Sequence, residues 1–285
     1  MAKTRQKRRP RPRPGSLREE EGSWKGVRAW LAGILSAVIV AAAGVVVTAW
    51  LNADGPDTLD RVTGEPPVKV GHVAVDHAAQ DLALRTPVQD PADRAVLLGS
   101  AGASRRDAVL ARHEWAPLEA AELTVVLVGN RSSVRIVDIQ PRVLGRAPVS
   151  DGALLVHTPA GEADAIELAA DLDQPAPRFA TSGDPDTPYF RKKQIDLKRD
   201  ERVTLSMAVT GTAACYTFDL LVTVLAGDRT EQLTITGPDR TPFRVTGTSA
   251  TYQGYYTYSQ MGGWQPIPRS QACAIEPKLA EAGKC

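Results

Sequence analysis

The sequence predicts a mainly β protein, an antiparallel immunoglobulin-like β-sandwich ectodomain joined to one N-terminal transmembrane helix. First, eight or nine short runs of β-branched and aromatic residues follow one another beyond residue 66, with Gly, Pro and Asp turns between them. Second, a single long uncharged apolar run precedes them. Third, hydrophobic residues make up 43% and charged residues 24% of the 285 residues, a composition typical of a globular protein.

Residues 1–28 form a basic tail, with ten Lys or Arg residues and three Glu, whereas the rest of the chain has 24 basic and 30 acidic residues. Alternating Arg and Pro prevents helix formation, so we expect a disordered cytoplasmic tail. Its residues 3–28 are expected to contact anionic inner-leaflet lipids. We do not expect a nucleic-acid partner, because residues 29–285 are acidic overall. The tail also lacks the interleaved aromatic residues on which bases would stack.

Residues 29–51 are predicted to cross the lipid bilayer. Trp30 and Trp50 are 20 residues apart, about 30 Å along a helix, so both would lie at a membrane interface. Lys25 and Arg28 precede the run, and acidic residues follow it. The positive-inside rule therefore predicts a single-pass type II protein of the cell (plasma) membrane, with its N-terminus in the cytoplasm and its C-terminal domain outside. A cleaved signal peptide is the alternative, but the run is longer than a signal core, which favours an uncleaved signal-anchor.

Small residues recur every four positions in this run, at Ala29, Gly33, Ala37 and Ala41. This spacing permits close packing of two helices and hence a homodimer, although an alanine-rich span also produces such a stripe by chance. Residues 52–66 are rich in Gly, Pro and Asp and read as a stalk. Residues 67–285 then form the ectodomain.

The ectodomain strands are predicted from alternation and β-branched content. Gly129-Asn130 would join two of them as a hairpin, and only Arg105–His113 reads clearly as helix, with Ser104 as a candidate N-cap. The segment 165–172 fits a strand or a helix. The expected strands are Val68–Val75, Leu123–Val128, Ser133–Ile139, Gln194–Leu197, Arg202–Val209, Cys215–Leu225, Glu231–Thr236, Pro242–Thr246 and Tyr252–Tyr258.

Three cysteines, Cys215, Cys273 and Cys285, lie in the outer region, where disulfides persist. The favoured pairing is Cys215 with Cys273, which would join the C-terminal segment to a core strand. A Cys273–Cys285 bridge and the absence of any bridge are the alternatives.

Motifs for catalysis and cofactor binding are absent from the sequence: no G-x-S-x-G, H-E-x-x-H, P-loop or G-x-G-x-x-G occurs. We therefore expect no enzyme, no cofactor and no catalytic or metal-binding residue. The four histidines, at 72, 77, 113 and 157, read as surface or turn residues. Four aspartates, at 171, 173, 184 and 186, could bind calcium, but solvated turns explain them better.

Two surface features are candidates for ligand contact. The basic residues 191–193, 198 and 199 would meet anionic wall polymers or protect a sheet edge. An aromatic stretch offers flat surfaces for sugars or peptides, although packing and pairing within the sandwich is the favoured explanation. Its members are Tyr252, Tyr255, Tyr256, Tyr258 and Trp264.

Together, the basic tail, the alanine/valine-rich anchor and the strand series CYTFDLLVTVLAGDRTEQLTITGPDRTPFRVTG, followed by GGWQPIP, resemble uncharacterised single-pass membrane proteins of high-GC Gram-positive bacteria. The resemblance covers the architecture and residues 119–267. It implies an anchored outer domain and carries over no catalytic residue. We expect a binding or structural protein whose partner is an extracytoplasmic protein or a cell-wall polymer. The alternative is a sensory or regulatory protein that couples the outer domain to the basic tail.

Overall fold

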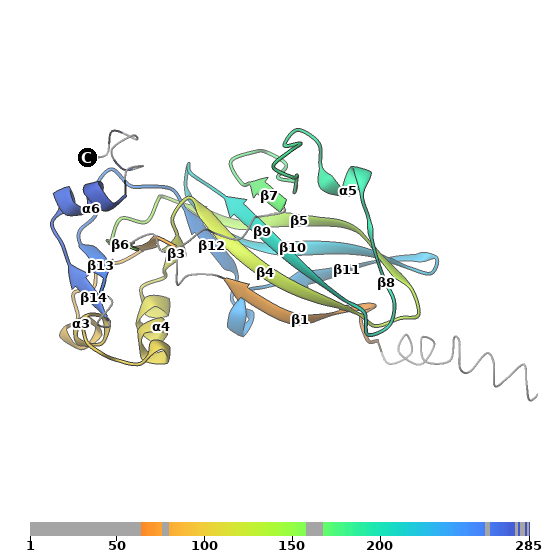
Figure 1. Ribbon diagram of the computed structural model, residues 1–285, viewed down its shortest axis with the longest axis horizontal. Coiled ribbons are helices and arrows are strands. Elements are labelled where there is room, and N and C mark those ends of the chain that lie inside the picture. Colours follow the sequence, from red (N-terminus) through yellow and green to blue (C-terminus); the bar gives the residue numbers. More distant parts are fainter. Residues whose placement is uncertain are drawn as a thin grey trace, which may run out of the picture. The chain divides into compact units, whose positions relative to one another are not determined.

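The computed structural model describes residues 64–75, 80–157, 168–259 and 263–276, together with Leu279, Gly283 and Cys285 (Figure 1). These residues belong to the second of the two units into which the chain divides, Pro56–Cys285. The predicted tail and transmembrane helix lie outside them, as do Lys25, Arg28, Trp30 and Trp50. Within the described ranges, no helix is both long and apolar enough to cross a membrane.

The described region is mainly β and contains three sheets. The first has the strand order β1 (Val68–Val75), β4 (Ala120–Gly129), β9 (Arg202–Thr210), β7 (Leu168–Asp171). The second has the order β11 (Arg229–Ile235), β10 (Cys215–Ala226), β5 (Val134–Ala147), β8 (Ile195–Leu197), and β12 (Phe243–Thr246) also pairs with β10. The third has the order β14 (Trp264–Pro266), β13 (Tyr255–Tyr258), β6 (Ala153–Val156), β2 (Leu82–Leu84), β3 (Ala116–Pro117).

The first two sheets share one hydrophobic core. Burial alternates along β4, where Leu123, Val125 and Leu127 point inward. Phe218 and Leu220 of β10 point into the same core from the second sheet. Because successive side chains of a strand lie on opposite faces, this alternation buries one face of each sheet against the other.

The third sheet is covered on both faces. Leu82 and Leu84 of β2 belong to one apolar cluster, and Ala83 between them belongs to another. Helices α3 (Pro91–Leu98) and α4 (Ala103–Arg112) lie on one side and α6 (Arg269–Ile275) on the other (Figure 1). A strand buried on both faces has no polar alternation, which explains why the sequence pattern did not predict β2 and β6.

Two predicted features of strand pairing are wrong. The sheets are not wholly antiparallel, because β7 pairs with β9 and β6 with β13 in parallel. The hairpin across Gly129-Asn130 does not form: β4 pairs with β1 and β9, whereas β5 pairs with β10 and β8 in the other sheet. The chain bends at residues 131–133 after β4 ends, but both long edges of β4 are already occupied, so the chain crosses to the second sheet.

The predicted helix at residues 105–113 corresponds to α4. It begins at Ala103 and has Gly102 as N-cap without a side-chain cap, so Ser104 lies inside the helix and does not cap it. The sequence analysis did not predict α3, although it begins with a clear signal: Asp90 Oδ1 accepts hydrogen bonds from the Ala92 and Asp93 amides, and Pro91 occupies the first turn. The remaining short helices are α5 (Tyr189–Lys192) and η1 (Pro238–Arg240).

The last residues of the predicted stalk contact the β-domain. Asn130 Nδ2 donates to Glu65 Oε2 at 3.1 Å and to the Pro66 carbonyl at 3.0 Å. Arg131 Nη2 donates to the Glu65 carbonyl at 2.5 Å. These contacts hold the chain where it enters β1. Asn130 is buried, and its side-chain amide is engaged in these two hydrogen bonds.

The predicted Cys215–Cys273 disulfide is wrong. Cys273 is bonded to Cys285, and Cys215 is a buried free thiol. Cys215 begins β10, opposite Ala147 of β5 and Thr246 of β12, whereas Cys273 lies on α6 against the third sheet. Cys215 therefore lies in the second sheet, whereas Cys273 packs against the third. The observed bridge closes a short C-terminal loop in which Leu279 is buried.

Candidate functional site

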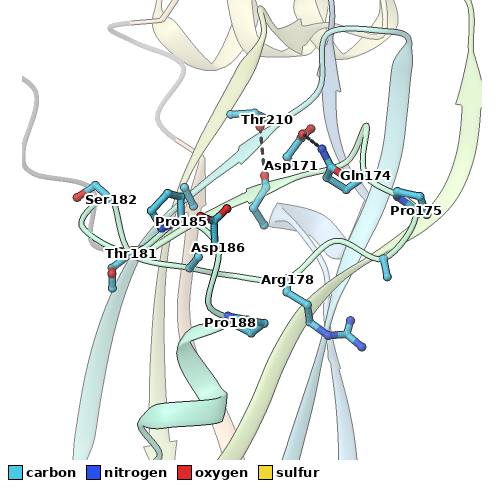
Figure 2. A pocket seen from close by; sticks show the side chains of 14 residues that line it. Asp171, Gln174, Pro175, Arg178, Thr181, Ser182, Pro185, Asp186, Pro188 and Thr210 are labelled. Atoms are coloured by element: carbon cyan, nitrogen blue, oxygen red, sulfur yellow. Dashed lines mark hydrogen bonds between the residues drawn. The ribbon is translucent and has the colours of Figure 1, made fainter.

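A cleft of about 760 Å³ lies beside β7, at the edge of the first sheet (Figure 2). Strand β7 and the segment that follows it, up to Pro188, form its walls, and Thr210 of β9 completes them. The lining residues are Ala169, Ala170, Asp171, Gln174, Pro175, Ala176, Arg178, Ala180, Thr181, Ser182, Pro185, Asp186, Pro188 and Thr210.

The proline-rich sequence of residues 172–188 explains why this segment folds back over the sheet edge. Proline has no N–H, so the segment cannot extend the sheet as a regular strand. Only Ala180 pairs with β7, through two backbone hydrogen bonds to Ala169 of 2.8 and 2.9 Å. Phe179 and Phe190 are buried in the core and fix both ends of the outer part of the loop. The cleft is therefore built by an anchored loop on a sheet edge.

The polar groups of the cleft are partly held by internal hydrogen bonds. Asp171 accepts from the Asp173 amide at 2.9 Å and from Gln174 Nε2 at 3.1 Å. Thr210 Oγ1 donates to the Ala170 carbonyl at 3.3 Å, and both this bond and the Asp171–Gln174 bond are drawn in Figure 2. Arg178 donates to Gln140 Oε1 of β5, and Figure 2 shows its side chain extending away from Asp186. Asp186 thus contributes a carboxylate to the cleft without Arg178 beside it.

Asp173 anchors the cleft loop to the turn between β9 and β10. It accepts hydrogen bonds from Tyr216 Oη at 2.5 Å, from the Thr212 amide and hydroxyl, and from the Ala213 amide. Burial raises the pKa of this carboxyl, but the hydrogen bonds outweigh it and lower the pKa to about 2. Burial, and then the bond to Asp173, raise the pKa of Tyr216 to about 12.

This anchor makes the stability of the protein pH-dependent. A carboxyl whose pKa is lower in the folded than in the unfolded state stabilises the fold above its unfolded pKa. We expect the free energy of unfolding of the wild type to be about 1 kcal/mol higher than that of Asp173→Asn at pH 6. The difference is this small because the Asp173 side chain is exposed and solvent screens its interactions. The difference should disappear as the pH falls from about 3.8 towards about 2. Urea unfolding across this range, with Asp228→Asn as the control, measures it; a difference independent of pH would contradict the assignment.

The four aspartates considered for calcium do not share one site. Asp173 binds the β9–β10 turn, and Asp184 pairs with Lys192 Nζ at 2.6 Å. The hydrogen bond from Lys192 lowers the pKa of Asp184. Asp171 and Asp186 both line the cleft. No group of three or more His, Cys, Asp or Glu side chains suited to hold a metal occurs in the part of the chain that the structure describes.

The predicted basic patch is divided among separate contacts. Lys192 pairs with Asp184, and Lys193 Nζ lies 5.7 Å from the centre of the Tyr189 ring. Arg191 and Lys198 are exposed, on α5 and just after β8 respectively. These charges therefore do not form one continuous anionic-ligand site.

The aromatic stretch packs mainly within the third sheet and offers little of the possible ligand surface. Tyr252, Tyr256 and Trp264 are 8%, 7% and 4% exposed, so they pack in the two clusters of the third sheet. Tyr255 is half-buried, and its hydroxyl accepts from the Tyr252 amide at 3.1 Å. Tyr258 alone of the five is exposed. The expected strand Tyr252–Tyr258 is shorter in the structure, because β13 begins only at Tyr255.

A second group of polar side chains joins α3, α4 and the loop after β2. This group was not predicted from the sequence. Thr86 Oγ1 lies 2.8 Å from His113 Nδ1, and His113 Nε2 lies 3.1 Å from Asp93 Oδ2. Arg112 also pairs with Asp93, and its hydrogen bond lowers the pKa of that carboxyl. His113 lies in the turn that ends α4, as the surface-or-turn interpretation allows, but its side chain is buried. Of the other histidines, His72 is exposed on β1 and His77 lies outside the described residues.

A hydroxyl, an imidazole and a carboxylate in this order are the components of a nucleophilic relay. Here the residue after Thr86 is Pro87, which has no N–H to stabilise an oxyanion. The Arg85 amide donates to the His113 carbonyl at 2.9 Å, so backbone and side chain of His113 fasten the same loop. We therefore interpret this group of polar side chains as the structural link between the two helices and the third sheet.

No protein-family profile matches this chain, and comparison with curated proteins and with solved structures found no significant similarity to either.

Proposed function

We propose that this chain is a membrane-anchored extracytoplasmic binding protein whose β-domain binds its ligand in the cleft beside β7. The observation that carries the proposal is the cleft itself, about 760 Å³ in volume and built on a sheet edge. Its lining combines proline and alanine with a few polar groups, as in clefts that bind small ligands or chain segments. The partner would be an extracytoplasmic protein or a cell-wall polymer.

The lining of the cleft supports binding of a ligand without catalysis. Among the described lining residues there is no histidine, cysteine or lysine, and no hydrogen bond joins the carboxylate of Asp171 or Asp186 to the hydroxyl of Thr181 or Ser182. A hydroxyl without an adjacent base is a weak nucleophile, so it contributes hydrogen bonds and not covalent catalysis. The proposal therefore includes no enzymatic activity and no cofactor for this cleft.

The membrane placement is supported by the sequence of residues 1–51. The uncharged run 29–51, with Trp30 and Trp50 at its ends and Lys25 and Arg28 before it, favours a single-pass anchor with a cytoplasmic N-terminus. The basic tail would then contact anionic inner-leaflet lipids. The alternative function is a sensory one, in which the outer domain is coupled to this tail. The anchor would also permit a homodimer.

We also propose that the first two sheets form an immunoglobulin-like β-sandwich. Their shared core and the alternation along β4 and β10 support this assignment. The third sheet and its helices would then be an addition to the sandwich, built from the segments around Leu82–Leu84 and Tyr255–Pro266.

Cysteine labelling tests the membrane orientation. After mild reduction of intact cells, an impermeant maleimide should label the exposed Cys285 and the half-buried Cys273, because both would face away from the cytoplasm. The control is the double variant Cys273→Ser/Cys285→Ser, which keeps only the buried Cys215 and should label far less. Labelling of wild type only after cell lysis would overturn the proposed orientation.

A further inference from the structure

We propose that the disulfide between Cys273 and Cys285 is a redox switch, which holds the end of the chain on the third sheet and releases it when a dithiol reduces the bond. This switch is independent of the cleft beside β7 and of the membrane orientation. Three observations support it: the bond is reachable from solvent, it joins two residues close to the end of the chain, and a buried leucine, Leu279, lies between them.

The bond lies where a dithiol can attack it. Cys285 is exposed, and Cys273 is half-buried on α6. Disulfide exchange begins when a thiolate approaches one of the two sulfur atoms, so the exposed cysteine is the point of attack. The third cysteine, Cys215, is buried on β10 in the second sheet and does not compete for either sulfur atom.

Reduction proceeds in two exchange steps. A thiolate of the dithiol attacks Sγ of Cys285 and forms a mixed disulfide, and the Cys273 sulfur leaves as a thiolate that takes up a proton. The second thiolate of the dithiol then attacks its own sulfur in the mixed disulfide and releases the Cys285 thiolate, which also takes up a proton. The dithiol loses two electrons and two protons and becomes a disulfide, and the protein gains two thiols. The reverse exchange, with a disulfide as the oxidant, restores the bond.

Helix α6 has contacts of its own and does not depend on the bond. Ala272 is fully buried in the apolar cluster of the third sheet, and its carbonyl accepts from the Glu276 amide at 2.9 Å. At the beginning of the helix, Arg269 Nη2 donates to the Ala250 carbonyl at 3.0 Å. The helix ends before Pro277, which has no N–H to continue it. Reduction should therefore release the chain beyond Glu276 and leave α6 in place.

Beyond Glu276, Leu279 is the one described side chain that is buried. It is 3% exposed and belongs to the same apolar cluster as Leu154 and Val156 of β6. Its amide donates to the Glu276 carbonyl at 3.1 Å, a contact that lies between the two cysteines and does not reach the sheet. Holding a residue in one conformation costs backbone entropy, and burial of one leucine offsets this cost for only a few residues.

The disulfide supplies the remaining restraint, because it ties the end of the chain to α6. Its two cysteines are 12 residues apart in sequence, so it limits the positions that Leu279 can reach. Once the bond is reduced, Leu279 should spend much of its time outside the cluster. The apolar atoms that it covers on the third sheet then become exposed, and this is the change that the switch produces.

Hydrogen exchange of the full-length protein in detergent tests the switch. Dithiothreitol, a dithiol, is added without denaturant, and maleimide labelling counts the thiols that appear. We expect two new thiols, and exchange of the Leu279 amide that is at least about 10-fold faster than in the oxidised protein. Exchange in β10 should stay unchanged, because the bond lies outside the core of the first two sheets. Addition of glutathione disulfide after removal of dithiothreitol should restore slow exchange at Leu279.

Two variants separate the bond from the leucine. Cys273→Ser/Cys285→Ser should exchange like the reduced wild type and no longer respond to dithiothreitol. Leu279→Ala keeps the bond and removes the buried side chain, so the amide of residue 279 should exchange faster even in the oxidised protein. Gln271→Ala is the matched control, because Gln271 is exposed on α6 and its replacement should leave exchange unchanged.

Four results would overturn the switch. A bond that dithiothreitol reduces only in denaturant is not accessible in the folded protein. Equal exchange of the Leu279 amide before and after reduction would show that packing alone holds it. Faster exchange in β10 upon reduction would make the bond a support of the whole domain. Failure of glutathione disulfide to restore slow exchange would show that release is not reversible.

Discussion

Replacement of Phe218 by alanine should lower the free energy of unfolding by about 3–5 kcal/mol, a large share of the stability of a single domain. Phe218 lies on β10 and is fully buried in the core that the first two sheets share. Its ring stacks on Phe243 of β12 with 5.4 Å between ring centres. Truncation leaves a cavity bounded by β-strands on several sides, and strands held in a sheet cannot collapse to fill it.

The matched control is Tyr258→Ala, which removes a ring of similar size from an exposed position. Tyr258 contacts the rings of His157 and Trp264, so a cost of about 1 kcal/mol is expected. Urea unfolding of the full-length protein in detergent, followed by tryptophan fluorescence, measures both variants. Equal losses for the two positions would contradict the assignment of Phe218 to the core.

A second large effect is expected for Gly247→Ala, at about 3 kcal/mol of destabilisation. A Cβ atom at this position would lie 1.8 Å from the carbonyl oxygen of Thr212, far inside van der Waals contact. The Gly247 amide also donates to the Ala214 carbonyl at 3.1 Å, so backbone holds the residue from both sides. Neither neighbour is a flexible side chain, and relief of the clash requires the β9–β10 turn to move away from the end of β12.

Gly183→Ala makes the same chemical change where no atom lies within 4 Å of the added methyl group. We expect its free energy of unfolding to stay within about 0.5 kcal/mol of wild type. Thermal unfolding of both variants, monitored by circular dichroism, provides the comparison. A similar loss in both would contradict the clash with Thr212 as the cause, because the effect of a glycine-to-alanine change on the unfolded chain is stabilising.

The position of Gly247 explains why its replacement should affect more than one sheet. The preceding residue, Thr246, is fully buried, and its hydroxyl oxygen accepts from the Ser150 amide at 3.0 Å. The Thr246 carbonyl accepts from the Glu119 amide at 2.7 Å, just before β4. The end of β12 therefore connects the second sheet to the chain segments that lead into β4 and β6.

Strands with one buried face could be predicted from the sequence with good boundaries. Arg202–Val209 and Cys215–Leu225 correspond to β9 and β10 with a difference of one residue at the C-terminal end. Alternation is a local property of the chain, because the polarity of each residue indicates whether its side chain lies on the buried or the exposed face of the sheet. The short strands β2 and β6 carry no alternation, since both of their faces are buried.

The candidate site could be predicted only in part. The sequence analysis identified the aspartates of residues 171–186 as a polar Pro-rich loop, and Asp171 and Asp186 do line the cleft. It could not separate them from Asp173, whose partners Thr212 and Tyr216 lie some 40 residues further along the chain. A carboxylate held by distant donors and one that faces a cleft look the same in sequence.

Residue type and local period are enough to predict the longer strands with one buried face, helix α4 and the contrast in charge between residues 1–28 and the rest of the chain. The tertiary structure decided which strands pair, that Cys273 bonds Cys285, and that His113 joins Thr86 to Asp93. Each of these depends on which distant segments share a core. That choice is made by the packing of whole sheets, whose contacts join residues far apart in the chain.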